Sequence, residues 1–266
     1  MNDKTRYIIL RQREIMKGYT SADVNAEDTD QMQELPPPQM FSKPKCREII
    51  SLPLDFRDCV SERGIADLLA ERKSLHDFSP VALTMKELSF LLWATQGMRS
   101  FAGKEVKVSY RNVPSAGSRH PLETYMFIDK VIGLKSGLYH YLPMGHMLQL
   151  LEEGDDYREE LAKALCDQAF ALEAAVVFVW SAVPYRTEWR YGLKAAKYIM
   201  IDAGAVLENL YLAGEAVGCG TCALGAYDQE LLDELLGFMP GPSAEPGYEF
   251  SLLAAAVGKR RKRPQP

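Results

Sequence analysis

The sequence predicts an α+β fold in which strands and helices surround one long buried helix. The run from Ala174 to Val183 is short, continuously apolar and rich in β-branched residues, which is typical of a central strand. Residues Thr124 to Ile128 are aromatic and apolar and predict a second buried strand. The longest helical stretch is Trp189 to Val217, and its part from Tyr198 to Gly214 is hydrophobic almost all round, interrupted by two acids and an asparagine. Because such residues are costly in lipid, we expect a core helix and no membrane span.

The composition is that of an ordinary globular protein that can bury a sizeable core within its 266 residues. A net charge of −5 argues against nucleic acid as the main partner. The first residues lack the apolar core of a signal peptide, and the five cysteines are scattered. We therefore expect a cytoplasmic protein in a reducing compartment.

The first fifty residues predict an extension or linker, and the folded domain is expected over residues 51–266. Tyr7 to Lys17 predicts a short helix, residues 21–33 are polar and acidic, and Pro36 to Pro38 cannot be helical. Four residues in this region have the spacing of EF-hand calcium ligands, but the glycine of the sharp turn is missing, so a solvated acidic linker is the preferred interpretation. These residues are Asp23, Asn25, Glu27 and Glu34.

Capping residues predict the remaining helices, and alternation of apolar and polar residues predicts the remaining strands. Thr84 and Glu87 form a capping box that begins a helix over Met85 to Gln96, and Asp228 is a second N-cap. A metal site at His140 and His146 is not expected, since no carboxylate or cysteine lies at ligand spacing. The other expected elements are a loop over 99–110, strand 123–129, a hairpin of 137–141 with 147–151, helix 157–172, a helix from 228 to 236, and strand 248–257.

Two segments have the composition of ligand-binding loops. Two cations, a hydroxyl and an imidazole lie within the five residues from Arg72 to His76 and suit a phosphate, although a polar helix terminus has the same composition. Pro114 to Pro121 contains two prolines, a glycine and two serines, which predicts a tight loop with exposed backbone. A loop of this kind can press N–H groups and hydroxyls against a flat ligand, and an ordinary β-turn is the alternative.

Residues Gly218 to Ala223 match the dinucleotide-binding fingerprint, but a long helix precedes them where that motif needs a strand. Cys219 and Cys222 are too few ligands for structural zinc. We interpret the segment as small residues that allow close approach of the backbone.

The order of these segments resembles the nitroreductase family, and more narrowly its SagB/ThcOx-type dehydrogenases. Pro114 to Ser118 is similar to the flavin-contacting loop, and Arg72 to Phe78 is similar to the opening phosphate motif, with Lys73 and His76 where the family most often has arginine. Arg190-Tyr191-Gly192 and the segment 204–209 resemble the Lys-Tyr-Gly and Gly-His-x-x-Gln-Asn signatures. The departures from these signatures are Arg190, Ala205 and Glu208.

The resemblance implies a mixed sheet flanked by helices around a central buried helix, with FMN bound by residues 51–266. It implies main-chain contacts to the flavin near Gly225 and a basic residue after the last strand that reaches the phosphate. Tyr191 and Arg190 are the expected catalytic residues. The expected cofactor-binding residues are Arg72, Lys73, Ser74, His76, Pro114, Ser115, Ala116, Gly117, Ser118, Ala223, Leu224, Gly225, Ala226, Lys259 and Arg260.

The function that the resemblance implies is an FMN-dependent oxidoreductase that exchanges a hydride at flavin N5 with a small organic substrate. NAD(P)H is a candidate electron donor, and a homodimer is expected because the small-residue loop of the family reaches the flavin of the other subunit. Two alternatives stay open: a peptide azoline dehydrogenase that works with a partner protein, and a non-enzymatic flavin-binding protein.

Overall fold

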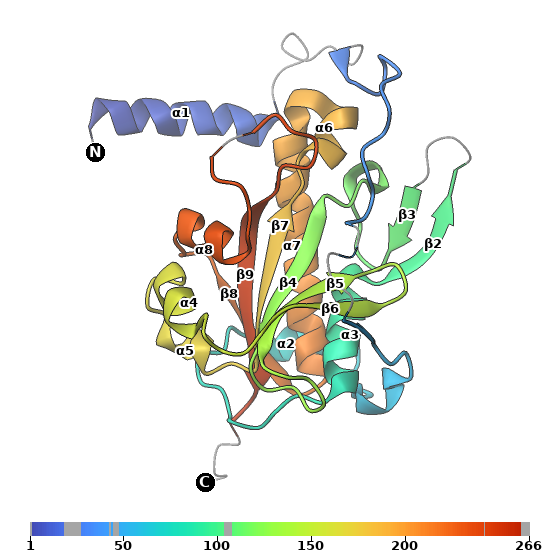
Figure 1. The fold of residues 1–266 in the computed structure, drawn as a ribbon, viewed down its shortest axis with the longest axis vertical. Coiled ribbons are helices and arrows are strands. Elements are labelled where there is room, and N and C mark those ends of the chain that lie inside the picture. The colour runs from blue at the N-terminus through green and yellow to red at the C-terminus, as the bar shows by residue number, and fades with distance from the viewer. Residues whose placement is uncertain are drawn as a thin grey trace.

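One seven-stranded sheet organises the chain (Figure 1). The computed structural model describes residues 2–18, 28–42, 44, 48–103, 108–241 and 243–261. The strand order is β1-β6-β5-β4-β7-β9-β8, and every neighbouring pair in this sheet is antiparallel. The strands are β1 (Ile49–Ser51), β4 (Leu122–Ile128), β5 (Gly137–Leu142), β6 (Met147–Glu153), β7 (Val176–Ala182), β8 (Cys219–Leu224) and β9 (Phe250–Lys259). A separate hairpin pairs β2 (Met98–Ala102) with β3 (Val108–Arg111).

Helices cover both faces of the sheet. The α-helices are α1 (Asp3–Lys17), α2 (Ile65–Glu71), α3 (Met85–Gln96), α4 (Arg158–Ala164), α5 (Ala169–Leu172), α6 (Tyr185–Tyr191), α7 (Ala195–Ala216) and α8 (Gln229–Leu235). Short 3-10 turns lie at η2 (Phe56–Cys59), η3 (Ala116–Ser118) and η4 (Gly192–Lys194). Met126 and Phe178 join the core under α3 and α7, whereas Tyr125 and Val177 join the core under α4 and α8. Because β4 and β7 are buried on both faces, most of their residues are apolar.

The α+β architecture is confirmed, and several elements match the sequence prediction closely. Helix α3 has the predicted bounds, and both hydrogen bonds of the Thr84–Glu87 capping box are present. Asp228 caps α8 through the Leu231 N–H. The sheet itself is antiparallel where a mixed sheet was expected. In the described part of the chain, parallel pairing occurs at the isolated bridges Ser74–Thr221 and Leu83–Val131.

Other elements differ from the prediction for local reasons. The helix expected over 157–172 is two helices, because Cys166 and Asp167 adopt left-handed backbone angles (φ 53° and 56°). The long helical stretch is divided at Gly192 (φ 50°) into α6 and α7. The loop expected over 99–110 holds most of the β2–β3 hairpin, and the small-residue segment after α7 is strand β8.

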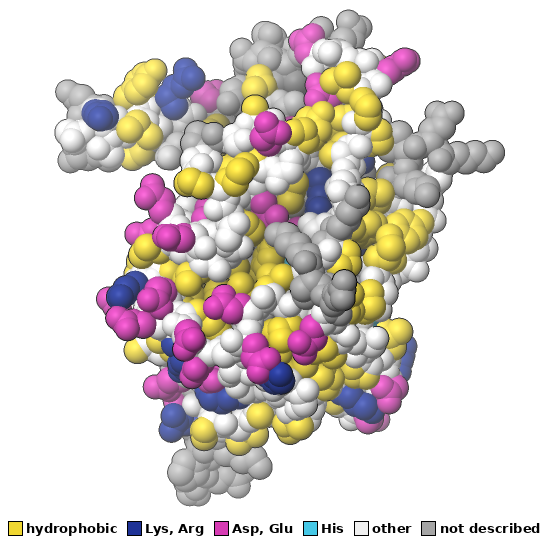
Figure 2. All heavy atoms as spheres, viewed as in Figure 1, with side chains coloured by type: hydrophobic (Ala, Val, Ile, Leu, Met, Phe, Trp, Pro, Cys, Tyr) yellow, Lys and Arg dark blue, Asp and Glu magenta, His cyan; other side chains and the backbone are white. Residues whose placement is uncertain are grey.

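The N-terminal extension has two different parts. Helix α1 projects from the body (Figure 1) and carries hydrophobic and basic side chains on its surface (Figure 2). Residues 28–42 instead pack along α6 and differ from the solvated linker that composition predicts: Tyr185 donates to Asp30 and the Trp189 indole donates to the Leu35 carbonyl. Asp23, Asn25 and Glu27, three of the residues at calcium-ligand spacing, lie outside the described residues. The division at residue 50 stays a prediction.

Two sequence expectations concern features of the whole chain. Within the described ranges, no helix combines the length and apolarity needed to cross a membrane. The same ranges hold no group of three or more metal-ligating side chains.

Acidic side chains gather over α4 and α8 on the side of the sheet away from the β2–β3 hairpin (Figures 1 and 2).

Candidate active site

The loop from Pro114 to Pro121 is fastened to the central helix by one carboxylate. Ser115 Oγ donates to Asp202 Oδ2 at 2.5 Å, and the Ala116 N–H donates to Asp202 Oδ1 at 3.2 Å. Ser115 Oγ in turn accepts the His120 N–H at 2.9 Å. Burial raises the pKa of Asp202, although both hydrogen bonds favour its ionised form. A single α7 side chain therefore holds the start of the loop, and Ser115 links that start to His120 near its end.

The loop backbone is strained. Gly117, Ser118 and His120 all have positive φ (56°, 54° and 46°), a conformation that costs free energy for residues other than glycine. Arg119 lies between them and is buried, with its Nε donating to the Arg186 carbonyl at 2.6 Å and its guanidinium 4.9 Å from the Trp189 ring. Such strain persists only where surrounding contacts enforce it, and it clusters at functional sites.

The two expected catalytic residues lie against this loop. A Cβ atom at Gly117 would come within 2.5 Å of the Tyr191 hydroxyl oxygen and 3.1 Å of Arg190 Nε. The Arg190 guanidinium lies 5.7 Å from the centre of the Tyr191 ring, and Tyr198 packs edge-on against that ring at 4.7 Å. Only glycine therefore permits this close approach, and three predicted site residues are brought together.

A second group of predicted residues meets around Tyr211, further along α7. The Tyr211 hydroxyl lies 2.9 Å from Ser74 Oγ and accepts the Ala223 N–H at 2.9 Å. The Arg72 guanidinium lies 5.2 Å from the centre of the Tyr211 ring. These contacts hold segment 72–76 against β8, although the two segments lie far apart in the sequence. A Cβ at Gly220 would lie 2.2 Å from Leu75 Cδ2, and this agrees with our interpretation of the small residues.

The predicted phosphate ligands differ in how their charges are balanced. Neither Arg72 nor Lys73 forms an ion pair with any described residue. Lys259 and Arg260 are held by Glu87 and Glu215. Of the remaining predicted residues, His76 packs edge-on against Phe170 at 4.6 Å, Leu224 pairs with β9, and Gly225 and Ala226 are exposed. The uncompensated positive charge therefore lies at Arg72 and Lys73.

One chain does not gather all the predicted residues at one place. Asp202, which holds the 114–121 loop, and Tyr211, which holds segment 72–76, are nine positions apart on α7. At 1.5 Å per residue this corresponds to about 14 Å along the helix axis. The two halves of the predicted site therefore lie at different levels of the same helix.

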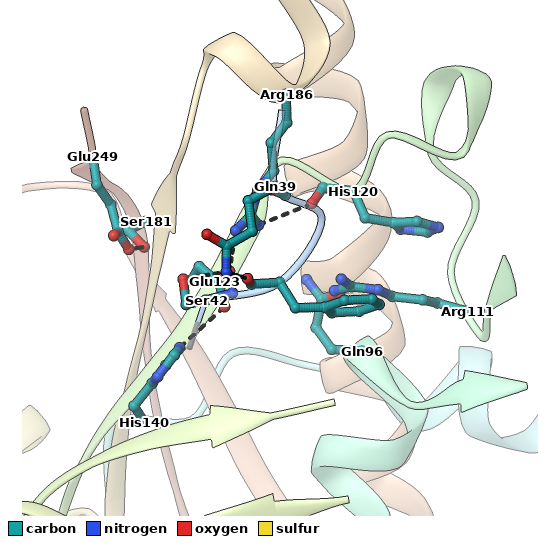
Figure 3. A network of polar contacts seen from close by, with 11 residues as sticks. Gln39, Ser42, Gln96, Arg111, His120, Glu123, His140, Ser181, Arg186 and Glu249 are labelled. Carbon is teal, nitrogen blue, oxygen red and sulfur yellow. Dashed lines mark hydrogen bonds and ion pairs between the residues drawn. The ribbon is translucent and has the colours of Figure 1, made fainter. Parts of the chain in front are cut away.

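A buried ionic network beneath the loop was not predicted (Figure 3). Glu123, at the start of β4, accepts from Arg186 Nη2 at 2.5 Å and from Ser42 Oγ at 2.9 Å, and lies 3.0 Å from His140 Nε2. Burial alone would raise the pKa of Glu123, but Arg186 and His140 outweigh it and hold the pKa far below its ordinary value. The sequence signal that could have revealed this network is Glu123 itself, because an acid within a mostly apolar, buried strand requires a partner for its charge.

Arg111 and His120 lie beside this network (Figure 3). Arg111 is 3% exposed, and its Nη1 donates to Gln96 Oε1 at 2.6 Å. Burial lowers the pKa of Arg111 to about 10, so it stays charged at neutral pH. Burial and then Arg111 lower the pKa of His120 to about 3, so its imidazole is neutral.

Comparisons with known proteins agree on one family. The nitroreductase family model matches residues 69–259. A Methanocaldococcus jannaschii protein described as a candidate nitroreductase is 31% identical over 202 residues, which cover 76% of this chain and 93% of that protein.

Two solved structures share the fold. A structure from Anabaena variabilis described as a candidate nitroreductase has a TM-score of 0.67 at 22% identity, over 91% of this chain and 46% of that one, so the chain spans less than half of that relative. The Escherichia coli microcin synthetase McbBCD complex with truncated pro-MccB17 bound contains a chain with a TM-score of 0.59 at 14% identity, over 98% of this chain and 95% of that one.

The neutral His120 makes stability depend on pH. Its pKa is lower in the folded protein than the ordinary 6.5, so the unfolded chain takes up the proton first and the free energy of unfolding falls as the pH drops below 6.5. Between pH 7 and 5 we expect a loss of up to about 2 kcal/mol from this residue. His120→Asn, which tolerates the left-handed backbone, should remove that loss in urea titrations. If the free energy of unfolding falls equally with pH in the variant and in the wild type, His120 is not the group responsible.

Proposed function

The chain belongs to the nitroreductase family, and we propose that within it the protein is an FMN-dependent oxidoreductase of the SagB/ThcOx type. The observation that carries the proposal is the contact of Gly117 with Tyr191 and Arg190. Two signatures far apart in the sequence meet there, in a strained loop that Asp202 fastens to the central helix. That is the arrangement expected if both signatures serve one reacting centre.

The residues present fit FMN. A phosphate needs cations that the protein has not already neutralised, and Arg72 and Lys73 meet this requirement beside the exposed Ser74. These three residues would hold the phosphate and ribityl chain, while loop 114–118 and the exposed main chain at Gly225 and Ala226 would lie against the ring. When bound, FMN supplies hydride exchange at N5.

The chain's own contribution to the chemistry is the handling of a proton. Desaturating a C–N or C–C bond removes a hydride from one carbon and a proton from the neighbouring nitrogen or carbon, and that proton needs an acceptor near the reacting atoms. The Tyr191 hydroxyl, which lies beside Gly117, is the acceptor that we propose. A tyrosine requires a nearby cation to act as a base at neutral pH, and Arg190 lies over its ring. Arg190 keeps its own proton and serves as the cation.

The cofactor test uses the purified protein. It should be yellow and release FMN, and not FAD, on heating, because no segment suits an adenine dinucleotide. NAD(P)H oxidation should then be followed with quinone and nitroaromatic acceptors, and azoline oxidation should be followed separately with dioxygen as the electron acceptor. We expect turnover of at least one small acceptor without another protein. A colourless protein that takes up no added FMN would overturn the proposal.

The same assay addresses the alternatives. A peptide azoline dehydrogenase would oxidise the azoline in the presence of a partner protein, and the fold shared with a microcin synthetase chain supports this candidate. A flavin-binding protein without activity would turn over none of these substrates.

We expect a homodimer in which each loop 114–118 reaches the other subunit's 72–76 segment, because the two lie about 14 Å apart along α7 in one chain. Met200 and Ile201 are exposed on α7 (61% and 57%), next to exposed Gly204. Ile201→Glu should convert a dimer to a monomer in light scattering and lower FMN affinity with it. Ile132→Glu, at an equally exposed position outside α7, is the control. A wild-type monomer that is loaded with flavin would contradict this expectation.

The charge balance ranks the phosphate ligands. Arg72→Ala should weaken FMN binding by about 2 kcal/mol, roughly thirtyfold in Kd, because it removes a charge that no carboxylate of the described chain neutralises. Lys259→Ala should cost about 1 kcal/mol or less, because Glu87 already holds that ammonium group. Fluorescence titration of FMN measures both values. Equal losses would show that the ranking is wrong.

Tyr191→Phe tests the proton role. The variant should fold and bind FMN, yet lose roughly 100-fold or more in rate with a substrate whose oxidation releases a proton from carbon or nitrogen. Quinone reduction, which takes its proton readily from water, should change much less. Unchanged rates on both substrates would assign Tyr191 to packing against Tyr198.

A further inference from the structure

A cavity of about 340 Å³ lies between the β2–β3 hairpin and loop 114–121. Its wall includes Pro114, Ser115 and Ser118, which also belong to the proposed flavin loop. Arg99 comes from the hairpin, and Arg111 comes from the end of β3. The cavity therefore adjoins the proposed reacting centre, and its two arginines belong to none of the motifs.

The cavity carries unmatched positive charge. Its described lining contains two arginines and no acid. Arg99 is exposed and forms no ion pair with the described residues. Arg111 is almost fully buried, and its Nε has no hydrogen-bond partner in the described chain. The hydrogen bond that Arg111 does donate goes to a neutral amide, Gln96.

No nearby group neutralises Arg111 by direct contact. Glu123 is close enough to favour its charged form, but that carboxylate is bonded to Arg186, His140 and Ser42. The His120 imidazole on the cavity wall lies 3.0 Å from the Ser109 carbonyl. A buried guanidinium that no carboxylate contacts is costly, and an anion in the adjoining cavity would lower that cost through its charge.

We propose that this cavity binds a carboxylate of the substrate, so that the enzyme prefers small molecules with an acid group near the bond that is oxidised or reduced. The planar fork of arginine matches a carboxylate through paired hydrogen bonds. The volume suits one small acid group and its immediate substituents. The inference rests on the proposed function and adds the substrate class to it.

The experiment compares two acceptors of nearly equal shape, 4-nitrobenzoate and 4-nitrobenzamide, with the FMN-loaded protein. Wild type should favour the acid in kcat/KM. Arg99→Glu should lower the acid-to-amide ratio of kcat/KM at least tenfold, because it replaces attraction by repulsion. Lys163→Glu, the same charge change on α4, should leave the ratio unaltered. An unaltered ratio in Arg99→Glu would overturn the proposal.

Two further measurements separate this inference from the proposed function. If neither acceptor turns over, ligand-observed NMR of the same two probes reports binding directly, and selective binding of the acid that Arg99→Glu abolishes would still support the cavity. The Kd of FMN should be equal in Arg99→Glu and Lys163→Glu. A selective loss of FMN from Arg99→Glu would mean that the cavity holds cofactor, which would overturn the proposal. Arg111→Lys retains the positive charge but lacks the planar guanidinium group. This variant should weaken the binding of 4-nitrobenzoate more than that of 4-nitrobenzamide.

Discussion

The ion pair between Glu123 and Arg186 is the interaction on which the arrangement of the site depends. Glu123 receives hydrogen bonds from Ser42 and Arg186 and contacts His140, so it joins the N-terminal segment, β4, β5 and α6 (Figure 3). Arg186 also donates to the Gln39 carbonyl, and its own carbonyl accepts from Arg119 in the loop. Both side chains of the pair are at most 4% exposed. Removing one partner of such a pair leaves an uncompensated buried charge at a cost of about 3–5 kcal/mol.

This network explains how a strained loop can be kept in one conformation. Residues with positive φ at Ser118 and His120 would relax if the surrounding contacts were weak. Arg119 is held from the α6 side, and Ser115 and Ala116 are held by Asp202 from the α7 side. Because α6 ends at Tyr191, the contacts that position the loop also position the hydroxyl against Gly117. Fold stability and site geometry therefore depend on the same few residues.

The sequence was informative wherever a structure is determined locally. The Thr84 capping box and the Asp228 cap depend on residues within one turn, and both are present as predicted. The apolar run that forms β7 identified a strand buried on both faces, because few other structures need such a run. The order of the family motifs also predicted the nitroreductase family correctly, although the roles of the motif residues stay predictions.

Features that depend on distant partners could not be predicted in this way. Nothing local to Lys259 indicates that Glu87 neutralises it, and nothing local to Tyr211 indicates that it bridges Ser74 and Ala223. The β2–β3 hairpin was missed because its strands are short and lie apart from the main sheet, so alternation is weak. The separation of the two half-sites follows from where each motif meets α7, which is a property of the folded chain.

The distribution of charge connects the fold to the chemistry of the site. The protein is acidic overall, with a net charge of −5, yet the loop is surrounded by arginines. Arg119 illustrates their mutual effect: burial lowers its pKa first, and Arg190 and Arg186 lower it further. Such clustering is unfavourable for the isolated protein, and Glu123 compensates only part of it. A site that binds or develops negative charge would regain that cost on binding. The acidic surface over α4 and α8 lies away from the hairpin, so it does not cancel the local field (Figures 1 and 2). The arginines gathered around the loop therefore favour a bound negative charge at this place.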